Sequence, residues 1–137
     1  ECFAAPFMPR PATVYAKMLG EKIKEHKTIV YLINTGWSGG PYGVGKRIEI
    51  KYSRAMVTAA LTGSLDIVKY RHDDLFNLDI PVECPDVPSE ILDPKNTWID
   101  KDSYDLSAKK LSQMFIDNFK KFKDVSPDIK NAGPTHS

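Results

Sequence analysis

The chain has 137 residues, of which 42% are hydrophobic and 27% charged, and its formal net charge is +1. This composition is too apolar for a disordered protein and fits one domain or a large piece of one. A nearly neutral chain has no overall field to recruit nucleic acid, and no apolar run approaches the roughly 20 residues of a membrane helix. We therefore expect neither nucleic acid nor a membrane among its partners.

The first third of the sequence predicts a helix and then a strand. Apolar residues recur at three- and four-residue spacing from Tyr15 to Ile23, which indicates an amphipathic helix with Pro11 near its start. Residues 28–33 are a continuous β-branched and aromatic run, typical of a strand buried on both faces of a helix-flanked sheet. The cysteines, Cys2 and Cys84, lie in no CxxC pair, so we expect reduced thiols.

A glycine-rich loop follows at residues 34–45, with five of the chain's eight glycines. Residues 47–51 alternate between polar and apolar, which predicts a half-buried strand. We expect a second helix to open at Tyr52 and Ser53, with Ser53 as its N-cap and Gly63 just past its end.

The second half of the chain is less regular until its last long element. A brief strand is expected near residues 67–70, then an ordered but irregular surface segment over residues 73–96. Aromatic and apolar residues at helical spacing from Tyr104 to Phe122 predict a long amphipathic helix whose stripe packs in a core, and residues after Pro127 are expected to fray. The order of elements favours an α/β layer arrangement, and so few strands, together with a first residue Glu1 that is not methionine, suggest a fragment.

Residues 40–46 match the GxxxxGK spacing of a phosphate-binding P-loop. A P-loop needs Ser or Thr after the lysine to reach the metal ion, whereas Arg47 stands here. It also leads into a helix whose amides bind phosphate, and the pattern after Lys46 predicts a strand instead. We therefore interpret the match as accidental.

The same stretch permits two other interpretations. Arg47 could lie along a purine face, Ile48 could pack on that face, and Ser53 could hydrogen-bond a ring nitrogen. The simpler interpretation is a tight surface turn in which Lys46 and Arg47 are solvated and Ser53 only caps a helix. From the residues alone the simpler one is favoured. The scattered His26, His72 and His136 have no metal-ligand spacing, so we expect no metal site here.

Longer stretches resemble a known family. Residues 34–48, from Asn-Thr-Gly-Trp-Ser to Gly-Lys-Arg-Ile, are similar to a signature of the ATP-dependent phosphoenolpyruvate carboxykinases. Further similar stretches lie at residues 3–7, 50–51, 53–55, 59–65, 84–85, 87–89, 92–98, 111–122 and 132–134. The resemblance thus covers almost the whole chain.

The resemblance implies a lyase that converts oxaloacetate and ATP to phosphoenolpyruvate, ADP and carbon dioxide. The parent enzyme would be cytoplasmic and would use Mg²⁺ and Mn²⁺. Residues 1–137 would be the C-terminal portion of its mononucleotide-binding lobe, an α/β fold with a long amphipathic C-terminal helix. Its P-loop, metal ligands and catalytic residues would lie upstream of Glu1, so the upstream portion of the same enzyme is an expected partner.

By the same resemblance, Arg47, Ile48 and Ser53 would lie around the adenine of ATP. Serine stands at position 53 where the family pattern has threonine, which keeps the hydroxyl and loses a methyl group. No catalytic or metal residue is carried over, and the fragment alone is predicted to be inactive. The alternative is a complete, non-catalytic nucleotide-binding or interaction module.

Overall fold

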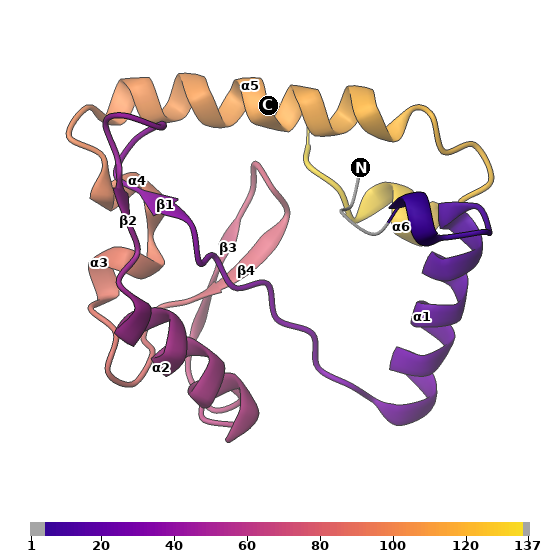
Figure 1. The fold of residues 1–137 in the computed structure, drawn as a ribbon, viewed down its shortest axis with the longest axis horizontal. Coiled ribbons are helices and arrows are strands. Elements are labelled where there is room, and N and C mark those ends of the chain that lie inside the picture. Colours follow the sequence, from indigo (N-terminus) through magenta and orange to yellow (C-terminus); the bar gives the residue numbers. More distant parts are fainter. Residues whose placement is uncertain (1–4, 136–137) are drawn as a thin grey trace.

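The structure, a computed structural model, describes residues 5–135. Cys2, Phe3, Ala4 and His136, which the sequence arguments mention, lie outside this range. Helices and short strands are mixed along the chain (Figure 1). The elements are η1 (Ala5–Phe7), α1 (Ala12–His26), β1 (Trp37–Ser38), β2 (Lys46–Arg47), α2 (Ile50–Leu61), β3 (Tyr70–Asp73), β4 (Leu78–Pro81), α3 (Ser89–Leu92), α4 (Pro94–Thr97), α5 (Lys101–Phe119) and α6 (Pro127–Asn131).

The strands form two separate antiparallel pairs, β1 with β2 and β3 with β4. At the coarsest level this agrees with the α/β prediction, because helices and small sheets alternate. A helix-flanked sheet containing residues 28–33 is not present among residues 5–135. Each pair is a hairpin between neighbouring segments, so both sheets depend on local turns.

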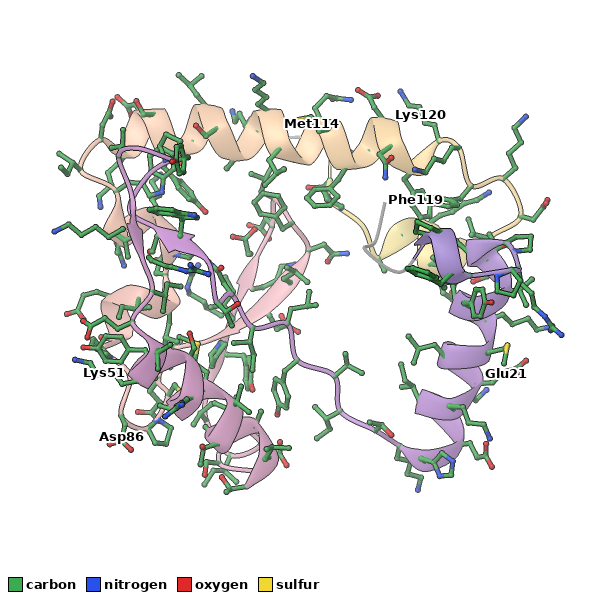
Figure 2. The ribbon with its side chains drawn as sticks, in the orientation of Figure 1. Glu21, Lys51, Asp86, Met114, Phe119 and Lys120 are labelled. Atoms are coloured by element: carbon green, nitrogen blue, oxygen red, sulfur yellow. The ribbon has the colours of Figure 1, made fainter. Side chains whose placement is uncertain are left out.

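We call residues 12–33 the arm, which comprises α1 and the extended segment after it. The predicted helix is present, and it ends where Lys27 adopts a left-handed conformation with φ 51°. None of its residues is buried. The segment after α1 crosses the molecule as an extended trace whose side chains project on both sides (Figures 1 and 2).

The prediction of a strand buried on both faces at residues 28–33 is wrong for this chain. The segment is extended but pairs with no other strand among the described residues. Val30 and Leu32 are 61% and 82% exposed. Tyr31, on the opposite side of the extended backbone, packs against the core, and its hydroxyl donates to Asp66 Oδ1 at 2.7 Å. The pattern predicted the backbone conformation, but residues 5–135 supply a partner for only one face.

We call residues 50–97 the body, because it contains the buried cluster Ala59, Leu65, Cys84 and Val87. Ala59 comes from α2, Leu65 from the turn after it, and Cys84 and Val87 from the loop between β4 and α3. Partly buried side chains of α2 and α3 pack around this cluster: Tyr52, Ala55, Met56, Ala60, Ile91 and Leu92.

The helix α2 begins earlier than the sequence predicts. Its first residue is Ile50 and its N-cap is Glu49, so Ser53 lies inside the helix and does not cap it. The predicted strand at residues 47–51 is therefore wrong beyond Arg47. At the other end, Gly63 has φ 72° and Ser64 N donates to Ala59 O at 3.0 Å, which is the predicted glycine termination.

The irregular segment predicted for residues 73–96 contains a hairpin that the pattern did not reveal. Strand β3 starts at Tyr70, slightly later than expected, and pairs with β4 so that Tyr70 faces Pro81 and Asp73 faces Leu78. Pro81 ends β4, where its missing N–H breaks the least pairing. The turn is held by Phe76 N, which donates to Asp73 Oδ1 at 2.8 Å.

Helix α5 occupies the segment where helical spacing was noted, with Asp100 as its N-cap. Its only buried residues are Ala108 and Ser112, while Phe115 is 52% exposed, so the aromatic stripe is not core in this chain. The expected fraying after Pro127 is also wrong as far as residue 135: α6 follows, and Thr135 Oγ1 donates to Asp74 O at 2.7 Å. Within the described residues, no helix is long and apolar enough to cross a membrane.

Candidate functional site

The glycine-rich loop is folded into the β1–β2 hairpin. Trp37 is the register partner of Arg47, and Ser38 that of Lys46. The turn is closed at Pro41, whose carbonyl oxygen accepts from Val44 N at 3.0 Å and from Gly45 N at 2.9 Å. The loop is therefore an ordered turn.

Asn34 and Gly45 hold the two sides of this hairpin. Asn34 Oδ1 accepts from Gly36 N at 2.9 Å, and Asn34 Nδ2 donates to Trp37 O at 3.2 Å. A Cβ on Gly45 would lie 2.8 Å from Ser38 O and closer still to Gly40 O, so no larger residue fits there without moving backbone. The glycine is required by close approach.

The geometry differs from that of a P-loop, although one reason given from the sequence was wrong. A helix does follow the lysine, because α2 begins at Ile50. Lys46, however, lies in strand β2, outside the first turn of that helix. The N-cap is Glu49, whose carboxylate pairs with Lys51 at 2.8 Å, and a carboxylate at this position opposes phosphate binding.

The three residues expected around adenine lie within a single stretch that joins β2 to α2. Arg47 is exposed at the end of β2, Ile48 is half-buried in the connection, and Ser53 is half-buried inside α2. Ile48 is fixed by its backbone, since its N–H donates to Gly36 O at 2.9 Å. No hydrogen bond or ion pair joins the three side chains to one another among residues 5–135.

The side-chain polar groups of Arg47 and Ser53 have no protein partner within residues 5–135. No carboxylate of that range lies within ion-pair distance of the Arg47 guanidinium, and the Ser53 hydroxyl makes no hydrogen bond there. An arginine offers five donors in a plane that stacks on aromatic rings, and a serine hydroxyl both donates and accepts. The two groups are thus available to a planar, hydrogen-bonding ligand.

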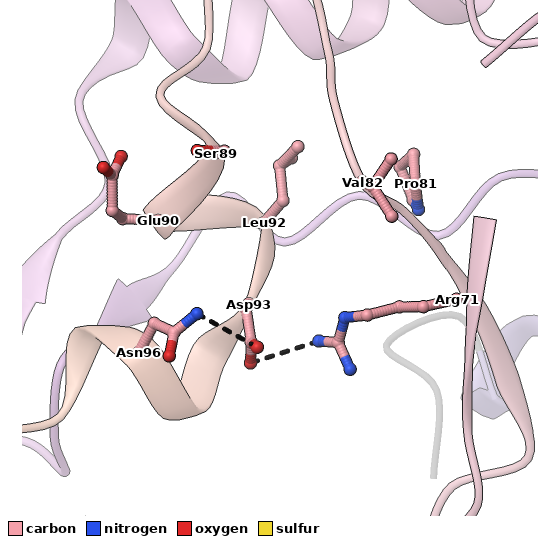
Figure 3. Close-up of a pocket in the computed structure, with 8 residues that line it drawn as sticks. All are labelled: Arg71, Pro81, Val82, Ser89, Glu90, Leu92, Asp93 and Asn96. Carbon is pink, nitrogen blue, oxygen red and sulfur yellow. Dashed lines mark hydrogen bonds and ion pairs between the residues drawn. The ribbon is translucent and has the colours of Figure 1, made fainter. Parts of the chain in front are cut away.

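A hollow with a volume of about 260 Å³ lies on the body, away from the three residues expected around adenine. Figure 3 shows its polar centre, where Arg71 pairs with Asp93 at 3.1 Å. Asp93 also caps α4 by accepting from Lys95 N, and Asn96 Nδ2 donates to it (Figure 3). Neither Arg47, Ile48 nor Ser53 lines this hollow. Its central charges already neutralise each other, so it offers little to an ionic ligand.

Titratable groups give no second candidate. Among residues 5–135, no group of three or more His, Cys, Asp or Glu side chains is arranged to hold a metal ion. Burial raises the pKa of the Cys84 thiol above its usual range, which makes it an unreactive core residue. A hydrogen bond to Asp79 raises the pKa of His72. The hydrogen bond from the Ser103 hydroxyl lowers the pKa of Asp100, the N-cap of α5.

Comparison with known proteins identifies the family. A family model described as phosphoenolpyruvate carboxykinase matches residues 1–90. The chain belongs to the phosphoenolpyruvate carboxykinase family. The resemblance in the sequence is thereby confirmed.

Curated phosphoenolpyruvate carboxykinase relatives match nearly the whole chain. The phosphoenolpyruvate carboxykinase (ATP) of Caldanaerobacter subterraneus subsp. tengcongensis is 64% identical over 133 residues, or 97% of this chain and 26% of that protein. The one from Fusobacterium nucleatum subsp. nucleatum is 59% identical over 137 residues, or 99% of this chain and 26% of that protein. The chain therefore spans about a quarter of the length of these relatives.

The polar contact that holds the β1–β2 hairpin against the rest of the chain was not predicted from the sequence. Ser38 and Thr97 meet through their hydroxyls although 59 positions separate them. No spacing rule links residues so far apart. The only hint was that both belong to stretches similar to the family, residues 34–48 and 92–98.

Proposed function

We propose that this chain is the adenine side of the ATP site in an ATP-dependent phosphoenolpyruvate carboxykinase. The observation that carries the proposal is that Arg47, at the end of the hairpin, and Ser53, just after it in α2, have side-chain polar groups unused by residues 5–135. In this arrangement the Arg47 guanidinium stacks along the purine, Ile48 packs on the ring, and the Ser53 hydroxyl bonds a ring nitrogen.

The reaction proposed for the whole enzyme is the conversion of oxaloacetate and ATP to phosphoenolpyruvate, ADP and carbon dioxide. Divalent metal ions, Mg²⁺ and Mn²⁺, would neutralise negative charge on the nucleotide and substrate. We propose that the metal ligands lie in the part of the enzyme outside this chain, which spans about a quarter of the length of its relatives. We likewise propose that residues 1–137 are the C-terminal part of the nucleotide-binding lobe of a cytoplasmic enzyme.

The arm supports a further part of this proposal, namely that the remainder of the enzyme packs against it. Val30 and Leu32 present apolar side chains on the face opposite Tyr31, and the extended backbone between them has no strand partner among residues 5–135. Exposed β-branched and apolar residues on an unpaired extended segment are suited to strand pairing. Relatives about four times as long contain enough additional chain to cover this face.

The test is made by substitution in the complete enzyme. We expect Arg47→Ala to raise the KM for ATP by roughly tenfold, since a lost charge-assisted contact contributes about 1.5 kcal/mol or more. Ser53→Ala should raise it less, and Ser53→Thr should leave it near the parent value because the hydroxyl is retained. The KM for oxaloacetate should not change in any of these.

Arg10→Ala is the matched control, because Arg10 is also exposed but lies before α1. It removes the same side chain far along the sequence from the hairpin and should leave both Michaelis constants unchanged. If Arg47→Ala and Ser53→Ala both left the KM for ATP at the parent value, the assignment of this stretch to the adenine would be wrong.

A further inference from the structure

The hairpin is fastened to a distant part of the chain. The Ser38 hydroxyl, at the end of β1, donates to Thr97 Oγ1 at 2.9 Å, and this contact is partly buried. Thr97 Oγ1 in turn donates to Pro94 O at 2.7 Å. Figure 1 shows the β1–β2 hairpin lying beside α4 and the start of α5. The bond therefore ties the hairpin to the last residue of α4.

The backbone approaches closely at the same point. A Cβ built on Gly39 would lie 3.0 Å from Thr97 O, and Gly39 has φ 81°, a conformation that favours glycine. The loop thus touches Thr97 both through the hydroxyl of residue 38 and through the backbone of residue 39. Two adjacent contacts on one residue define the position of the loop better than either alone.

Thr97 is itself held firmly, because the junction between α4 and α5 is densely hydrogen-bonded. Lys101 Nζ donates to the carbonyl oxygens of Lys95, Asn96 and Trp98 at 2.7, 2.9 and 2.8 Å. Lys95 Nζ pairs with Asp105 on α5 at 2.7 Å. These bonds surround Thr97 on both sides in the sequence, so the hairpin is fastened to a fixed point.

The fastening is one register position from the proposed ligand contact. Ser38 pairs with Lys46, and the next pair is Trp37 with Arg47. Any rotation of β1 away from α4 would carry Arg47 with it, since the two strands form a single hairpin.

We propose that the Ser38–Thr97 bond positions the hairpin so that Arg47 is in place before the purine binds, and that Thr97 is a positioning residue for the base end of ATP. This rests on the proposed function of Arg47. Thr97 does not touch the nucleotide in this arrangement. It acts through the hairpin, by limiting the positions that the hairpin adopts when no ligand is present.

The expected signature is a split between the two Michaelis constants. In the complete enzyme, Ser38→Ala and Thr97→Val should each raise the KM for ATP roughly threefold to tenfold, the range for one lost hydrogen bond. The KM for oxaloacetate and kcat at saturating ATP should stay at parent values. The double variant should raise the KM for ATP no further than the single variant with the larger effect, because both changes remove the same bond. Thr97→Ser keeps the hydroxyl and should bind ATP as the parent does.

Ser103→Ala is the control, since the Ser103 hydroxyl donates to Asp100 in the same junction and does not reach the hairpin. It should leave the KM for ATP unchanged, and thermal melting of every variant checks that each one is folded. If Arg47→Ala weakens ATP while Ser38→Ala and Thr97→Val do not, the positioning role is wrong and the adenine assignment stands. If Ser38→Ala and Thr97→Val leave the KM for ATP unchanged, and Arg47→Ala and Ser53→Ala do so as well, both proposals fail. An equal rise in the KM for ATP and for oxaloacetate would indicate a general structural defect and would also overturn the positioning role.

Discussion

The arm and the body contain similar apolar residues but bury them very differently. Leu65 in the body is 4% exposed, whereas Leu32 in the arm is 82% exposed. The body surrounds its buried cluster with α2, the loop before α3, and α3 itself. In the arm, Tyr31 packs against that cluster, whereas α1 contains no buried residue.

This difference shows that an apolar pattern specifies a backbone conformation more readily than it specifies burial. Residues 28–33 are extended, as β-branched side chains favour. A strand becomes stable only when its N–H and C=O groups and its apolar faces find partners. In the body the partners lie nearby in the sequence, and for the outer face of the arm they are absent from residues 5–135.

The comparison predicts its largest difference in the free energy of unfolding when one leucine in each region is replaced by alanine. In the 137-residue chain, Leu65→Ala should lower the free energy of unfolding by about 2–5 kcal/mol, because it leaves a cavity in the small core. Leu32→Ala should change it by less than about 0.5 kcal/mol, as an exposed side chain loses little contact. Urea unfolding followed by circular dichroism measures both.

The same two substitutions in the complete enzyme sharpen the comparison. If the rest of the enzyme covers the arm, Leu32→Ala should there become destabilising, and the gap between the two variants should narrow. A Leu32→Ala variant that stayed neutral in the complete enzyme would mean that this face remains exposed, and the proposed packing against the arm would be wrong.

A second, smaller contrast uses one glycine from the arm and one from the hairpin. A Cβ on Gly20, inside α1, meets nothing within 4 Å, whereas one on Gly45 collides with backbone oxygens. Gly20→Ala should therefore stabilise α1 by about 0.5–1 kcal/mol through helix propensity. Gly45→Ala should destabilise the chain by about 1–3 kcal/mol, because backbone has to move. If both variants shifted the urea midpoint of unfolding by the same amount, the close packing of the hairpin around Gly45 would be contradicted.

Local signals in the sequence predicted local features well. The helix after Pro11 and the glycine that ends α2 at position 63 both follow from rules that span a few residues. The start of α2 was predicted late because Ser53 is a good cap on average. In this chain Glu49 takes the N-cap position without a side-chain hydrogen bond, which no preference table favours.

Features that depend on distant residues were not predictable in the same way. The hairpin of β3 and β4 was missed because prolines and acids obscure the alternation of its strands. The contact between Ser38 and Thr97 depends on how the whole body folds. The proposed adenine contacts Arg47, Ile48 and Ser53 came from resemblance to a family, and local pattern alone would have favoured an ordinary surface turn.

The smallest predicted effect concerns a pH-sensitive pair across the β3–β4 hairpin of the body. His72 Nδ1 lies 2.9 Å from Asp79 Oδ1 on the facing strand, and this hydrogen bond raises the pKa of His72 above its ordinary value of 6.5. The charges of Asp74, 4.0 Å from Nε2, and of Asp73 act in the same direction. A raised pKa means that the folded hairpin favours the protonated ring.

The stabilisation is thus fully present below the ordinary pKa of His72 and is lost as the pH rises through the elevated value. We expect Asp79→Asn to lower the pKa of His72 toward its ordinary value, as followed by the chemical shifts of the imidazole ring during an NMR titration. Asp74→Asn is the control and should lower the pKa by less, since its carboxylate is farther from the ring and fully exposed. A larger change from Asp74→Asn would show that the cross-strand bond is not the dominant cause of the raised pKa. The pairing of β3 with β4 would then not determine the pKa of His72.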